Sequence, residues 1–150
     1  MKLPRSALAW LGATLATAAT GSIVQTQFNL AAIQATGAPV PFDLRLQVTL
    51  QDLAGFAPML AGIAAAAFLV GFVVAAPLVR RWPRHRGGLY TLAGGVAVTT
   101  AILLMNLLLP ITVIGATRSL PGVAALGLSG ALGGRVYGWL APAPARRGMA

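Results

Sequence analysis

Four long apolar stretches alternate with short polar segments along this chain. They cover residues 7–24, 57–79, 88–109 and 120–140. As a helix with a rise of about 1.5 Å per residue, each stretch can cross a hydrocarbon core of about 30 Å. The pattern predicts an all-α membrane protein, a bundle of four transmembrane helices in one domain over residues 1–150, with a flexible basic tail from residue 141.

The longest polar segment lies between the first two stretches, from about Gln25 to Gln51. Its first part can continue the first helix, and Gly37 can end that helix in the left-handed conformation. Residues 42–51 then alternate strictly: the apolar positions are Phe42, Leu44, Leu46, Val48 and Leu50, and the polar ones Asp43, Arg45, Gln47, Thr49 and Gln51. This period of two predicts a short extended segment in the first outer loop, which needs a partner strand from the same loop or from another chain.

Four spans with a strand-bearing first outer loop resemble the arrangement of the claudins. The resemblance is topological only. The tryptophan and the cysteine pair that mark this loop in claudins are missing from residues 25–51. The resemblance therefore implies an architecture and carries no residue role or activity to this chain.

The charges divide the polar segments into two sides. Both acidic residues, Asp43 and Asp52, follow the first span, whereas nine of the eleven basic residues lie at the opposite ends of the spans: Lys2, Arg5, Arg80, Arg81, Arg84, Arg86, Arg135, Arg146 and Arg147. Because basic residues concentrate in cytoplasmic loops, both termini and the loop 80–86 are expected to be cytoplasmic. A rival interpretation treats the first stretch as a signal peptide cleaved after Ala16-Thr17-Ala18; it too leaves the following segment outside.

Composition limits the partners. The chain is 57% hydrophobic and 9% charged, with a formal net charge of +9. Its basic residues adjoin apolar spans instead of forming a polar, aromatic-interleaved surface, which favours membrane lipids as partners over nucleic acid. Expected contacts with anionic lipid are Arg80, Arg81, Arg84 and Arg86. A composition rich in arginine, alanine and glycine resembles that of GC-rich bacteria, so a bacterial inner membrane is expected.

Glycines in the fourth span give the strongest packing signal. Glycines spaced four apart remove one ridge of a helix and let another backbone approach closely. The row consists of Gly130, Gly134 and Gly138, with Gly127 adjoining. Its partner is either the first span, where Gly12, Ala16 and Thr20 form a matching row of small residues, or another subunit, identical or foreign.

Polar side chains in the spans are few. Asn106 near the outer end of the third span needs a hydrogen-bond partner, and Gln25, Gln27 and Asn29 are candidates for a small amide cluster with it. The cluster can be a structural clamp or a site for a polar solute or ion.

Few other residues of the chain are of the types that catalyse reactions or bind metal ions. The chain has no cysteine, one histidine (His85) in a basic loop, and two carboxylates nine residues apart. These cannot supply a conventional metal site, and no serine has an evident base beside it. No catalytic residue, metal site or cofactor is expected, so an enzyme is not predicted.

Two classes of function remain. The first is a non-catalytic accessory or scaffold subunit of an inner-membrane assembly, which binds a partner protein or another copy of itself. The second is a small oligomeric transporter or channel with a polar site near the outer leaflet. The first is preferred because the spans carry no acidic residue or histidine to couple or steer a solute.

Overall fold

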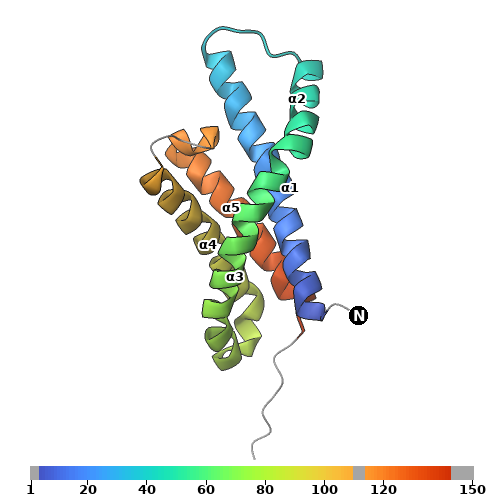
Figure 1. Ribbon diagram of the computed structural model, residues 1–150, viewed down its shortest axis with the longest axis vertical. Helices are drawn as coiled ribbons and strands as arrows, with labels where there is room; N and C mark the ends of the chain where they lie inside the picture. The colour runs from blue at the N-terminus through green and yellow to red at the C-terminus, as the bar shows by residue number, and fades with distance from the viewer. Residues whose placement is uncertain (1–3, 110–113, 143–150) are drawn as a thin grey trace, which may run out of the picture.

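The computed structural model describes residues 4–109 and 114–142, and every regular element among these residues is helical (Figure 1). The long helices are α1 (Arg5–Ala35), α2 (Phe42–Gly55), α3 (Ala57–Arg81), α4 (Arg86–Leu108) and α5 (Leu120–Leu140). Two short 3₁₀ turns, η1 (Pro83–His85) and η2 (Gly115–Arg118), precede α4 and α5. The expected tail beyond residue 142 lies outside the described residues.

Three helical stretches among the described residues are long and apolar enough to cross a membrane: Arg5–Ala35, Ala57–Arg81 and Pro83–Leu108. They indicate a membrane protein. Helix α5 has 21 residues, but its six glycines and Arg135 lower its hydropathy. It is also the most enclosed of the long helices, lying between α1 and α4 (Figure 1). A helix so enclosed needs less apolar surface than one that faces lipid.

The long helices run antiparallel along the bundle. On α5, contacts with α4 extend from Gly127 beside Thr99 to Gly138 beside Gly87. Contacts with α1 extend from Leu140 beside Gly12 to Leu126 beside Gly21. Helix α3 packs across α1 and α4 and closes the core with large apolar side chains. Those buried most completely in the bundle are Leu60, Phe68, Val79, Val98, Ile102, Ile114 and Leu126.

Local sequence explains several helix ends. Helix α1 ends at Ala35, and Gly37 follows with φ of +88°, which confirms its expected left-handed role. Helix α5 begins after Ser119, whose hydroxyl accepts a hydrogen bond from the Gly122 amide at 3.2 Å. Helix α4 ends at Leu108, and Leu109 is already extended, as residues before a proline usually are.

The prediction of an extended segment over residues 42–51 is wrong, because these residues begin α2. The apolar alternation hid a helical pattern among the polar residues: Arg45, Thr49 and Asp52 lie at i, i+4 and i+7, on the face that contacts α1. A helix satisfies its backbone hydrogen bonds within the segment, whereas a lone strand leaves them unpaired. No strand that could pair with it occurs in the described part of the chain.

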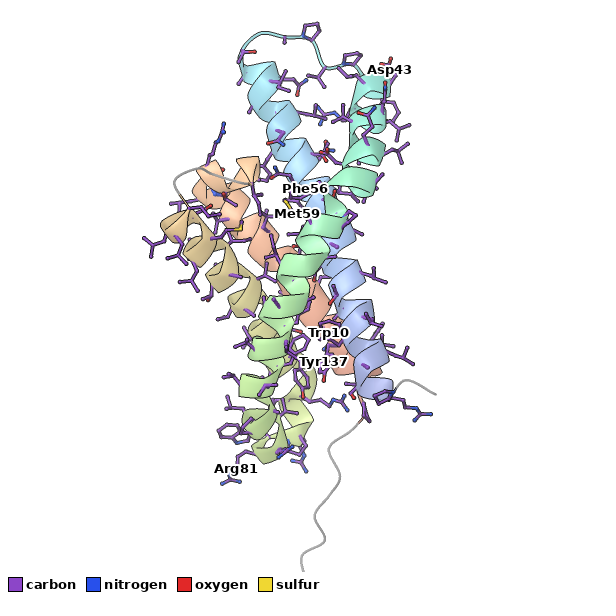
Figure 2. The ribbon with its side chains drawn as sticks, in the orientation of Figure 1. Trp10, Asp43, Phe56, Met59, Arg81 and Tyr137 are labelled. Carbon is purple, nitrogen blue, oxygen red and sulfur yellow. The ribbon has the colours of Figure 1, made fainter. Side chains whose placement is uncertain are left out.

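Helices α2 and α3 follow each other with almost no interruption. Phe56 between them keeps α-helical backbone angles, and Pro58 stands at the start of α3, where its missing N–H breaks the hydrogen-bond ladder. The pair therefore runs antiparallel to α1 over most of its length. Figure 1 shows the upper part of α1 together with α2 projecting beyond the ends of α4 and α5. Asp43 lies at the projecting end and Arg81 at the opposite end (Figure 2).

Candidate functional site

The glycine row of α5 packs against α4 of the same chain. A Cβ atom added to Gly94 of α4 would lie 2.8 Å from the Cα of Gly134, and one added to Gly134 would collide with the backbone carbonyl of Tyr90. Gly130 lies against Val98 and the carbonyl of Gly94, and Gly138 against Gly87. The two backbones thus touch directly, as the glycine spacing allows.

Helix α1 contacts a different face of α5. A Cβ on Gly133 would meet Thr17 and Phe68, and the Thr17 hydroxyl donates a hydrogen bond to the Ser129 carbonyl at 3.2 Å. Of the small-residue row expected on α1, Gly12 lies near Leu140 of α5, but Ala16 is only half-buried. The buried α1 residues on this side stand one position later than that row, at Ala13, Thr17 and Gly21.

The amide residues divide between two places. Gln25 is buried, and its side-chain oxygen accepts a hydrogen bond from the Ala116 amide of η2 at 2.8 Å. The Asn29 side chain lies beside Gly115 of the same turn. Asn106 also meets η2, because its oxygen accepts from the Thr117 hydroxyl at 3.3 Å. All three residues thus meet at η2, where Gln25 and Asn106 form hydrogen bonds and Asn29 lies beside Gly115.

Gln27 does not join these residues at η2 and instead contacts α2. Arg45 donates from its guanidinium to the side-chain oxygens of Gln27 and Gln34, and the Gln27 amide donates to the Thr49 hydroxyl at 3.3 Å. One turn nearer the bundle, the Thr26 hydroxyl donates to an Asp52 carboxylate oxygen at 2.6 Å. These contacts attach the polar face of α2 to α1.

Beside the face that contacts α1, about a quarter turn around α2, lies a row of exposed apolar residues. Phe42, Leu46 and Leu50 are 78%, 50% and 58% exposed, and no residue of α2 is buried. We call these three residues the α2 face. A helix packed on a soluble core turns its large apolar side chains inward, whereas these three remain exposed. The sequence signal that could have found this face is the spacing of four residues between Phe42, Leu46 and Leu50.

The expected lipid-contacting arginines lie at the end opposite to α2. Arg80, Arg81 and Arg84 are exposed around η1, whereas Arg86 is half-buried and donates a hydrogen bond to the backbone carbonyl of Ala141. Trp82 in the same turn is about half exposed.

An aromatic cluster lies above these arginines, and sequence reasoning missed it. The rings of Phe72 and Tyr137 stack with centroids 4.1 Å apart, and Tyr90 meets both edge-on at 5.5 and 4.8 Å. Phe68 stacks on Phe72 at 4.7 Å. Four residues from three helices form the cluster, so no short sequence motif could have marked it. Such pairs contribute about 0.5–1.5 kcal/mol each beyond burial.

The site offers packing and hydrogen bonding but little reactive chemistry. Within residues 4–109 and 114–142, no group of three or more histidine, cysteine or acidic side chains could hold a metal ion. His85 is exposed in η1, and Asp52 is engaged with Thr26.

Comparison with family models, curated proteins and solved structures gave no match at any of the three levels. Function must therefore be inferred from the residues and geometry of this chain.

Proposed function

We propose that this protein is a non-catalytic scaffold or accessory subunit of a bacterial inner-membrane assembly. In this proposal α1, α3, α4 and α5 cross the membrane, both termini lie in the cytoplasm, and α2 projects on the outer side, where it binds a partner protein. The observation that carries the proposal is the α2 face, since three large apolar side chains are exposed on a helix whose Arg45, Thr49 and Asp52 side chains are already engaged with α1.

The position of α2 argues that a protein covers this face. Helix α1 has 31 residues, or about 46 Å at about 1.5 Å per residue, whereas the 23 residues of α4 extend about 35 Å. Gln25 and Asn29 of α1 lie beside η2 near the ends of α4 and α5, so residues 30–35 of α1 extend beyond them together with most of α2. A large apolar patch in a polar environment marks an interaction surface.

The contacts of Asn106 favour a scaffold over the alternative of a transporter or channel. Its side-chain oxygen lies 3.3 Å from the Thr117 hydroxyl, which also donates to the Ile114 carbonyl at 2.7 Å, and the buried side chain of Gln25 bonds the backbone of the same turn. Hydrogen bonds within the chain are what a structural clamp requires. A solute site instead needs polar groups that are free to replace the water molecules around the solute.

Two matched lysine substitutions test the proposal. Leu46→Lys places a charge on the α2 face, whereas Gln47→Lys changes a neighbouring residue that is already polar and exposed. The protein would be crosslinked in intact cells and purified in mild detergent, and the adducts identified by mass. We expect one stoichiometric adduct that Gln47→Lys retains and Leu46→Lys reduces about tenfold or more. A charge on a central interface residue commonly costs about 1–3 kcal/mol of binding free energy, and about 1.4 kcal/mol corresponds to a tenfold change in affinity.

The mass of the adduct decides what the partner is. A different protein supports an accessory subunit, and a mass of two copies makes the α2 face a homo-oligomer interface. The absence of any adduct that depends on Leu46 would contradict the scaffold proposal. The transporter or channel would then be the remaining class of function, and solute flux in proteoliposomes would test it.

A further inference from the structure

An open groove runs between α1 and α3 on the side of the bundle, next to the aromatic cluster. It has a volume of about 460 Å³, and Trp10, Phe72, Val73, Tyr90 and Tyr137 are among its walls. Figure 2 shows Trp10 and Tyr137 close together between the two helices. Its surface is almost wholly apolar, and Val73 on its rim is 67% exposed. In a membrane this groove opens sideways into the hydrocarbon.

Two arginines border the groove at its end nearest η1. Arg86 stands one helical turn before Tyr90 on α4, and Ala141, whose carbonyl accepts its hydrogen bond, stands one turn after Tyr137. Arg80 stands one turn after Ala76, another wall residue, and is exposed. Residues four apart share a helix face, so both guanidinium groups continue the line of the groove.

These positive charges have no acidic partner in the chain nearby. Asp52 is engaged with Thr26 far along the bundle, and Asp43 lies at the projecting end (Figure 2). The Nε of Arg86 is buried and has no hydrogen-bond partner among the described residues, and the same is true of the indole nitrogen of Trp10. An apolar groove that ends at unneutralised guanidinium groups is complementary to a molecule with an apolar chain and an anionic head.

We propose that this groove binds one anionic phospholipid from the adjacent leaflet. An acyl chain lies against Trp10, Phe72 and Val73, and the phosphate meets Arg86 and Arg80. The site is a defined groove that holds a chain and a head together, which goes beyond diffuse attraction of lipid to a basic loop. It depends on insertion in a membrane and does not depend on the scaffold role of α2.

Trp10 provides a direct reporter of the bound chain. The substitutions Trp82→Phe and Trp139→Phe leave it as the sole tryptophan. The protein is reconstituted in mixed vesicles of phosphatidylglycerol and phosphatidylcholine, with bromine on the acyl chains of one lipid or the other at equal mole fraction. We expect brominated phosphatidylglycerol to quench Trp10 more strongly than brominated phosphatidylcholine. Equal quenching by the two lipids would overturn the proposal.

Substitutions of arginine separate the site from general surface charge. Arg86→Gln should lower the preference for phosphatidylglycerol roughly fivefold, since one arginine near an anionic surface contributes about that factor. Arg86→Lys should keep most of the preference, which shows that the folded groove persists when the charge is kept. Arg84→Gln, an exposed arginine in the same loop, should leave the preference nearly unchanged. Equal losses for Arg84→Gln and Arg86→Gln would overturn the site.

Two adjacent valines test whether the chain lies in the groove. Val73 and Val74 are each 67% exposed on α3, but Val73 lines this groove and Val74 faces the cleft between α3 and α4. Val73→Phe should fill the groove and reduce quenching of Trp10 by either brominated lipid, whereas Val74→Phe should not. Unchanged quenching in Val73→Phe would show that no chain occupies the groove.

Discussion

Single glycines set the closest contacts in this bundle. At Gly134 the neighbouring atoms belong to the backbone of Tyr90 and Thr91, so they cannot turn aside as the end of a flexible side chain can. At Gly62 of α3, by contrast, a Cβ would meet nothing within 4 Å. The same residue type therefore has a packing role at one position and none at the other.

This contrast gives a prediction for alanine substitutions at the two sites. Gly134→Ala should destabilise the protein by about 1–3 kcal/mol, because overpacking against backbone outweighs the gain of about 1 kcal/mol that alanine brings to a helix. Gly62→Ala should be neutral or slightly stabilising. Reversible unfolding in mixed micelles would measure both free energies of unfolding. Similar values for the two variants would contradict direct contact between α4 and α5.

At the scale of the elements, most helices could be predicted from the length of their apolar runs. Residues 57–79 and 120–140 were expected to be spans, and α3 and α5 occupy 57–81 and 120–140. Helix α2 could not be predicted in this way, because its apolar residues follow a period of two by coincidence, and its inward face carries the polar residues Arg45, Thr49 and Asp52. That face is recognisable only once Gln27 and Thr26 of α1 are known to lie opposite.

The attachment of α2 to α1 should depend on Arg45. Arg45→Ala removes the hydrogen bonds to Gln27 and Gln34, which together contribute about 1–3 kcal/mol. Amide hydrogen exchange over residues 42–55 should then accelerate roughly tenfold, while α4 and α5 keep their protection. Arg118→Ala, which removes an exposed arginine of η2, serves as the control and should leave α2 unchanged. If Arg45→Ala had no effect on exchange, another contact would have to hold α2.

The candidate sites consist of residues from different helices, and contacts between helices could not be predicted from the sequence. The residues Gln25, Asn29 and Asn106 were grouped by their polarity, but the turn that joins them, η2, lies in a mostly apolar link with no motif. The aromatic groove combines residues from four helices, as far apart as Trp10 and Tyr137. Such groups arise from the packing of whole helices, which a periodic pattern within one segment does not specify.

For the whole molecule, the number of crossings is the property on which the proposed function most depends. Hydropathy and length select three helices among the described residues, whereas the packing of α5 on α4 from Gly87 to Thr99 favours a fourth crossing. With three crossings the two termini lie on opposite sides of the membrane, and with four they lie on the same side. The distribution of basic residues predicts the second arrangement.

Because the chain has no cysteine, single cysteines can report this topology without background. We expect Ala38→Cys, in the connection before α2, to react with an impermeant thiol reagent in intact cells. Arg84→Cys and a cysteine at Gly148 should react only after the membrane is opened, since both are predicted to be cytoplasmic. Labelling of position 148 from outside, with position 84 still protected, would show that α5 does not cross. The glycine contacts between α4 and α5 would then have to form outside the bilayer, and the four-helix membrane bundle would be ruled out.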